Sequence, residues 1–159
     1  MIRGLIKIHK ADSPICPRLN RKDAPAYSLA RMLARNLEMF IPLPYIFKIK
    51  NTIQLMNNLL DIQFDQDLKF ISFDITNMYS NIPITKLIKI IEIMCKQNDL
   101  NIEIKNEIIK MCNILTKQNC FQYKDLQYIQ EDGIAMGAPT SSIFSEIYLQ
   151  YLESTKIFC

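Results

Sequence analysis

Apolar residues recur at intervals of three and four along much of the chain, which is the spacing of one face of an α-helix. Within residues 25–40, for example, Leu29, Leu33 and Leu37 stand at every fourth position. Similar repeats predict helices over residues 51–63, 83–97 and 101–117, and from residue 139 onward. We therefore expect five helices, each with one apolar face.

A second pattern, alternation with a period of two, marks candidate strands. It is clearest in KFISFDI (residues 69–75), where Ile71, Phe73 and Ile75 share one side. Shorter strands are expected at residues 4–9 and on either side of residues 124–125. Strands and helices in this order predict an α+β fold, in which helices pack on one face of a small antiparallel sheet.

The composition suits one domain with a buried core, because 49% of the 159 residues are hydrophobic. No apolar run approaches the roughly 18 residues of a membrane span, and no cleavable leader is recognisable. We therefore expect a soluble, intracellular protein with no membrane partner. The five cysteines form no CxxC pair and are expected to be reduced core thiols, and the single histidine, His9, does not favour a zinc site.

Positive charge is concentrated in the first third of the chain. Residues 1–50 contain ten Lys and Arg against three Asp and Glu (+7), and residues 51–159 contain nine against thirteen (−4), which together make the net charge of +3. A basic segment suits contact with phosphates, and an acidic segment suits metal ions held near those phosphates. A solvated basic surface explains the same distribution.

Two segments contain residues suited to chemistry. Asp74 ends the predicted strand, where a carboxylate can hold Mg²⁺, and Tyr79 follows in a predicted tight turn. The second segment, GIAMGAP (residues 133–139), contains two of the three glycines, which permit positive φ or close approach to a ligand. Both segments also have plain structural explanations, because an Asp after a strand often caps a turn and glycines often join a hairpin to a helix.

Five blocks of the sequence resemble consecutive blocks of Penelope-like retroelement reverse transcriptases. They are GLIKIHK (residues 4–10), APAYSLARMLA (24–34), FISFDITNMYSNIP (70–83), FQYKDLQYIQEDGIAMGAPTS (121–141) and SEIYLQYLE (145–153). The pairing of SFD plus a following aromatic residue with AMGxPxS is fairly specific, and KIHK favours this lineage over retroviral and bacterial relatives. The resemblance implies a partial right-hand polymerase, with fingers over about residues 1–68 and palm over about residues 69–159.

By this resemblance the chain is an RNA-directed DNA polymerase of a mobile element. Its partners are then an RNA template, a DNA primer and deoxynucleoside triphosphates, and its expected compartment is the nucleus. Asp74 and the backbone carbonyl of Ile75 are expected to bind catalytic Mg²⁺, or Mn²⁺, in a two-metal nucleotidyl transfer. Tyr79 is expected to be the steric gate against a 2′-hydroxyl, although a tyrosine there also suits a core position.

Further residues take roles from the same resemblance. Those expected to line the nascent base pair and the template are Met136, Gly137 and Pro139, and a side chain at position 137 is expected to collide with the base pair. Those expected to contact the triphosphate or the template backbone through their charge are Lys7, Lys10 and Arg18.

The sequence departs from this family at three points. The second palm motif, an aromatic residue, then any residue, then two aspartates, is absent, and no Asp-Asp pair occurs in the chain. Cys16 stands in place of a fingers arginine, a role left to Arg18 or Arg21, and Ile6 replaces a usual proline. We therefore expect a copy truncated before the Asp-Asp motif, with negligible primer extension. The alternative is a non-catalytic nucleic-acid-binding remnant or domesticated module.

Overall fold

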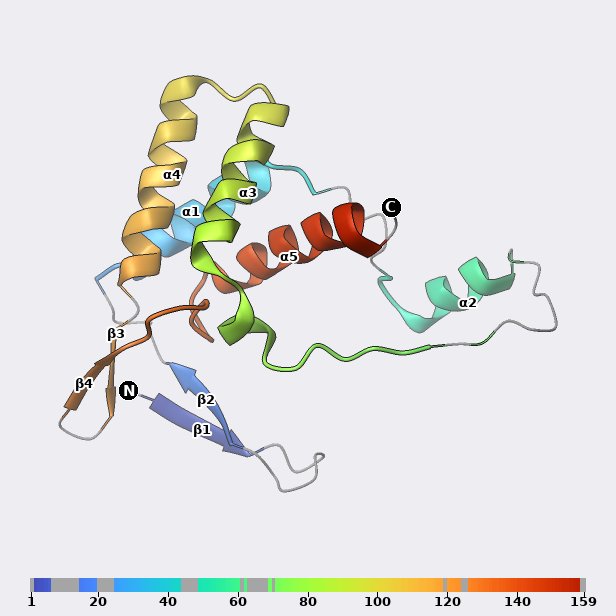
Figure 1. Cartoon of the computed structure of the whole chain (residues 1–159), viewed down its shortest axis with the longest axis horizontal. Helices are drawn as coiled ribbons and strands as arrows, with labels where there is room; N and C mark the ends of the chain where they lie inside the picture. Colours follow the sequence, from blue (N-terminus) through green and yellow to red (C-terminus); the bar gives the residue numbers. More distant parts are fainter. Residues whose placement is uncertain are drawn as a thin grey trace. The chain divides into compact units, whose positions relative to one another are not determined.

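The computed structural model describes residues 2–6, 15–19, 25–43, 49–60, 62, 69, 71–118, 120–123 and 126–157 (Figure 1). The chain divides into two compact units. Unit 1 comprises Met1–Leu43 and Asn77–Cys159, and unit 2 comprises Pro44–Thr76. The expected division into fingers and palm near residue 68 follows a different boundary and stays a prediction.

Four α-helices form the body of unit 1, and each lies where the apolar spacing predicts it. They are α1 (Tyr27–Phe40), α3 (Ile84–Gln97), α4 (Ile102–Lys117) and α5 (Ser141–Leu152), and a π-helical turn, η2 (Glu153–Ile157), extends α5. Helices α3 and α4 lie side by side, α1 packs against α4 and α5, and α5 also packs against α3 (Figure 1). None of the helices in the described chain combines the length and apolar character that crossing a bilayer requires.

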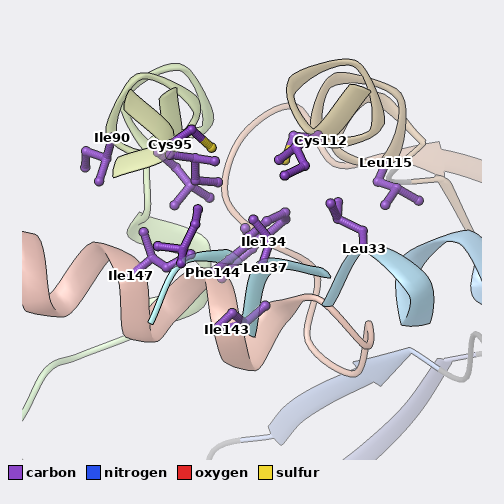
Figure 2. Packing of buried hydrophobic residues seen from close by; sticks show 14 of the residues in the cluster. Leu33, Leu37, Ile90, Cys95, Cys112, Leu115, Ile134, Ile143, Phe144 and Ile147 are labelled. Carbon is purple, nitrogen blue, oxygen red and sulfur yellow. The ribbon is translucent and has the colours of Figure 1, made fainter. Parts of the chain in front are cut away.

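The hydrophobic core of unit 1 lies between these helices and follows from their apolar faces. Figure 2 shows side chains from α1, α3, α4 and α5, together with Ile134, converging on one cluster. Leu33 and Leu37 are one turn apart on α1, and both are fully buried. Phe144 of α5, 2% exposed, is the largest of the fully buried side chains. The repeat of apolar residues at every fourth position therefore corresponds directly to the core.

Two pairs of short antiparallel strands complete unit 1. β1 (Ile2–Ile6) pairs with β2 (Ile15–Leu19), and β3 (Cys120–Tyr123) pairs with β4 (Leu126–Ile129), each pair as a separate two-stranded sheet. The two strands predicted on either side of residues 124–125 are confirmed. β1 overlaps the strand predicted at residues 4–9, and β2 was not predicted. The described chain is thus mainly helical, and two separate strand pairs replace the expected single sheet with helices on one face.

The predicted strand at residues 69–75 is the main correction. Residues 71–75 have no regular secondary structure, and Ile71, Phe73 and Ile75 are exposed. A strand is stable when neighbouring strands pair with its backbone groups, and neither strand pair of the described chain includes these residues. The alternation of side chains was therefore not sufficient to form a strand.

Unit 2 contains helix α2 (Thr52–Leu60), which lies within the predicted range of residues 51–63. Side chains define its start, because Asn51 accepts a hydrogen bond from the Gln54 N–H at 2.9 Å and Gln54 accepts one from the Lys50 N–H at 2.8 Å. No residue of α2 is buried, and its apolar residues Ile53 and Leu60 are largely exposed. The apolar spacing thus predicted the helix correctly but not its burial.

Three cysteines of the described chain are free thiols, as predicted, but only two of them belong to the core. Cys95 on α3 and Cys112 on α4 are fully buried, whereas Cys120 in β3 is exposed. The side chain of Cys16 and all of Cys159 lie outside the described residues. Burial disfavours the thiolate and raises the pKa of Cys112 from 9.0 to about 12, and the neighbouring Cys95 adds to this rise.

The buried thiol of Cys112 is expected to make stability fall as the pH rises above 9. Below its ordinary pKa of 9.0 the thiol is protonated in both states, whereas between pH 9 and about 12 only the unfolded chain loses the proton. The free energy of unfolding should then decrease through this thiol by up to about 1.4 kcal/mol per pH unit. Urea unfolding between about pH 8 and about pH 10.5 should show a shallower decline in Cys112→Ala than in the wild type.

The exposed Cys120 provides the control for this experiment. Cys120→Ala also removes one thiol, but an exposed one outside the core, so it should leave the pH dependence that arises from Cys112 in place. Equal slopes in the wild type, Cys112→Ala and Cys120→Ala would contradict the assignment of this pH dependence to Cys112.

Candidate functional site

The turn that leads into α3 contains Tyr79. It consists of Asn77 and the 3₁₀ helix η1 (Met78–Asn81), and is named the Tyr79 turn. Asn77 has a φ of 50°, a left-handed conformation that asparagine tolerates better than most residues. Its carbonyl oxygen accepts hydrogen bonds from the Ser80 hydroxyl at 3.0 Å and from the Asn81 N–H at 3.2 Å. The turn predicted from the sequence at residues 77–81 is therefore confirmed.

The Tyr79 side chain is half-buried and packs against the hydrophobic core of unit 1. Met78, beside it, does the same. This contact agrees with the structural explanation of Tyr79 as a core residue. Because the side chain is only half-buried, part of it also remains accessible to a ligand.

A second segment, residues 130–135, docks against the Tyr79 turn and is named the Gly133 loop. The Ile134 N–H donates a hydrogen bond to the Tyr79 carbonyl oxygen at 2.8 Å. Gly133 has a φ of +78°, and a Cβ atom there would lie 2.6 Å from the Ser80 carbonyl oxygen and 2.7 Å from the Ser80 Cα. Position 133 thus requires glycine both for its backbone conformation and for space.

Asp132 joins the Gly133 loop to the beginning of α3. Its Oδ1 atom accepts hydrogen bonds from the Ile84 N–H at 3.1 Å and from the Gly133 N–H at 2.8 Å. Ile84 is the first residue of α3, and Pro83 before it has no side chain that can cap the helix. The carboxylate therefore caps α3 from a loop 48 residues further along the chain.

Sequence reasoning did not assign a role to Asp132. The dipeptide Asp132-Gly133 is a turn signal. That signal says nothing about which helix the carboxylate reaches, because the contact with Ile84 depends on the packing of the whole unit. No local pattern could have found it.

Removing the Asp132 carboxylate is expected to cost stability. Asp132→Ala leaves the Ile84 N–H without its cap and should lower the free energy of unfolding by about 1 kcal/mol. Asp132→Asn retains a side-chain oxygen acceptor and should lie closer to the wild type. Chemical denaturation of both variants tests this, with Glu131→Ala, an exposed neighbour, as the control that should change little. A wild-type midpoint for Asp132→Ala would exclude the capping role.

The segment after the Gly133 loop forms two successive turns before α5. The Ala138 N–H bonds to the Ala135 carbonyl at 3.2 Å, and the buried Ser141 hydroxyl bonds to the same carbonyl at 2.6 Å. Gly137 is exposed with a φ of +95°, while Met136 and Pro139 are half-buried. These three residues therefore lie on a folded connection between the Gly133 loop and α5.

The structure brings together only some of the residues that the sequence singled out. The Tyr79 turn and the segment containing Met136, Gly137 and Pro139 both belong to unit 1 and are linked through the Gly133 loop. Asp74 and Ile75 are exposed residues of unit 2.

The three basic candidates lie in the N-terminal part of the chain. Arg18 lies in β2 opposite Arg3 of β1, and its side chain is outside the described residues. Lys7 and Lys10 are also outside the described residues. Their expected contacts with the triphosphate or the template backbone stay predictions.

Comparison with known proteins gives no match. Neither family models, curated proteins nor solved structures contain a significant relative of this chain. The resemblance to Penelope-like reverse transcriptases therefore stays a prediction from the sequence blocks.

Two described residues are expected to bind the metal ions. Asp74 offers one carboxylate and Ile75 a backbone carbonyl, which suits one Mg²⁺ that keeps water and substrate phosphates as its other ligands. Within the described chain, no three His, Cys, Asp or Glu residues come together as a metal site. Binding of Mg²⁺ by Asp74 and Ile75 stays a prediction.

Proposed function

We propose that this chain contains the nucleotide-selecting part of an RNA-directed DNA polymerase of a mobile element. One observation carries the proposal: the Ile134 N–H bonds to the Tyr79 carbonyl at 2.8 Å. This bond joins the turn that contains the expected sugar gate, Tyr79, to the Gly133 loop, and that loop leads directly into the segment with Gly137, to which the sequence resemblance assigns the template side. A polymerase needs those two segments next to each other, because both contact the same incoming nucleotide.

The proposal assigns a task to each group. The Tyr79 side chain, seated on the core, would meet the sugar and disfavour a 2′-hydroxyl. Residues lining the base pair and the template would be Met136, Gly137 and Pro139. Asp74 and the Ile75 carbonyl would hold Mg²⁺, which when bound neutralises charge on the triphosphate. Positive charge for the triphosphate and template would come from Lys7, Lys10 and Arg18.

Nucleotide binding tests this proposal without requiring turnover. Calorimetric titration of the 159-residue protein with a deoxynucleoside triphosphate and Mg²⁺ should show binding that is roughly tenfold tighter than that of the matching ribonucleotide. Tyr79→Ala should remove most of this difference, because the smaller side chain leaves room for the 2′-hydroxyl. Asp74→Asn should weaken binding and its dependence on Mg²⁺.

A matched control separates loss of a metal ligand from loss of charge. Asp99→Asn removes one negative charge at an exposed position with a φ of 51°, which asparagine adopts readily. It should bind nucleotide as the wild type does. Absence of nucleotide binding in the wild type, or equal binding by Asp74→Asn, would refute the polymerase proposal.

A second candidate function is non-catalytic nucleic-acid binding. It is favoured by the basic first 50 residues and by Arg31 and Arg35, which are exposed one turn apart on α1. Binding of an RNA or DNA oligonucleotide would then weaken steeply with salt, because each phosphate contact releases counterions. This second function would be supported by two results together. Oligonucleotide binding would change neither with Mg²⁺ nor in Asp74→Asn, and the protein would bind no nucleotide.

A further inference from the structure

The Gly133 loop contacts the Tyr79 turn and the first residue of α3 at three successive points. Before α3 begins, the Ile134 N–H bonds to the Tyr79 carbonyl, and Gly133 lies against the backbone of Ser80. At the first residue of α3, the Asp132 carboxylate accepts the Ile84 N–H. Three consecutive loop residues thus contact the turn and the helix that follows it.

Of these three residues, Asp132 makes its contact with α3 through its side chain, whereas Gly133 and Ile134 contact the turn through their backbone. The same Oδ1 atom bonds to the Ile84 N–H at 3.1 Å and to the Gly133 N–H at 2.8 Å. It therefore fixes the Gly133 amide relative to the first turn of α3. The side-chain amide of Gln130 also donates a hydrogen bond to the backbone carbonyl of Asp132 at 2.9 Å. This bond holds the backbone of Asp132 in the same loop.

The negative charge of Asp132 suits this place. The first N–H groups of a helix are unpaired within the helix and carry partial positive charge, so a carboxylate beside them is stabilising. Only four residues separate Tyr79 from Ile84, so a shift at the start of α3 is expected to reach the turn.

We infer that Asp132 is a positioning residue for sugar selection, holding Tyr79 at a set place in front of the Gly133 loop. This inference rests on the proposed function, because it assigns to Tyr79 the contact with the sugar. Without the carboxylate, the Gly133 amide and the start of α3 separate, and the Tyr79 backbone moves with them. The aromatic side chain then no longer meets the 2′ position in one orientation, and discrimination between the two sugars falls.

Two variants and one control separate positioning from general stability. Asp132→Ala removes the acceptor, whereas Asp132→Asn retains an oxygen at the same place and should restore wild-type behaviour. Asn101→Ala removes the cap of α4, where the Asn101 side chain accepts the Glu103 N–H at 2.8 Å. It costs stability by the same mechanism as Asp132→Ala but does not touch the Tyr79 turn.

The first measurement is amide hydrogen exchange, which does not require a nucleotide. In Asp132→Ala the Ile134 amide should exchange at least several-fold faster relative to the Phe144 amide of α5, which donates a hydrogen bond to the carbonyl of Thr140, the residue before the helix. The ratio of the two rates should be unchanged in Asp132→Asn and in Asn101→Ala. An unchanged ratio in Asp132→Ala would overturn the positioning role.

The second measurement is the affinity ratio of deoxy- to ribonucleoside triphosphate with Mg²⁺. Asp132→Ala should lower it in the same direction as Tyr79→Ala, while Asp132→Asn and Asn101→Ala should keep the wild-type ratio. If Tyr79→Ala lowers the ratio and Asp132→Ala does not, the inference is overturned and the proposed function stands. If the wild type binds neither nucleotide, the proposed function fails, and sugar selection by Asp132 fails with it.

Discussion

Replacing Phe144 with alanine should lower the free energy of unfolding by about 3–5 kcal/mol, the largest loss we expect from a single core substitution. Phe144 is 2% exposed and lies where α5 meets the side chains of the other helices (Figure 2). The loss combines the apolar surface no longer buried with the cavity left between close-packed neighbours. Since a domain of this size has roughly 5–15 kcal/mol of stability in total, this loss is a large fraction of it, and the unfolding midpoint should fall clearly.

Thermal and urea unfolding of the two forms measures this effect. Ser142→Ala is the control on the same helix, because Ser142 is exposed and its replacement leaves the core side chains in place. It should change stability by no more than about 0.5 kcal/mol. A loss below about 1 kcal/mol in Phe144→Ala would mean that α5 does not seat in the core as the structure has it.

Gly133→Ala should have the second largest effect, with an expected loss of roughly 2–4 kcal/mol. Part of the loss arises because alanine at a φ of +78° is strained. The rest arises because its Cβ would lie 2.6 Å from the Ser80 carbonyl oxygen, a backbone atom that cannot rotate away. The Gly133 loop must then move off the Tyr79 turn, which also strains the bond from Ile134 to Tyr79.

Gly137→Ala measures the cost of placing alanine at a positive φ without the clash against a neighbouring backbone. Gly137 has a similar positive φ of +95° but is exposed, so alanine there should cost only about 1 kcal/mol. The comparison is made by urea unfolding of both variants against the wild type. Equal losses at positions 133 and 137 would show that the contact with Ser80 does not limit position 133.

The helices could be predicted from the sequence because their evidence is local. Leu29, Leu33 and Leu37 recur at the helical spacing, and α1 buries Leu33 and Leu37 in the core. The paired strands on either side of residues 124–125 were predicted for a similar reason, since two short runs suited to strands lie close together in the sequence. In each case the residues that stabilise the element are close together in the chain.

The prediction of a strand at residues 69–75 was wrong, because residues 71–75 have no regular secondary structure. Its alternating pattern suits a strand, but strand formation depends on a second strand whose position the pattern does not specify. The candidate site was likewise predictable only in its local features. The turn at Tyr79 and the glycines at positions 133 and 137 were recognisable from residue type, whereas the contact between turn and loop was not.

By itself the sequence determined the α-helices and their apolar faces, the turn at residues 77–81 and the hairpin at residues 120–129, because backbone preference and side-chain spacing act over a few residues. Only the tertiary structure decided that the helices would meet in one core, that Asp132 would cap α3 and that Gly133 would lie against Ser80. These contacts join residues about 50 positions apart. Their geometry follows from how the helices pack, and helix packing is a property of the whole unit.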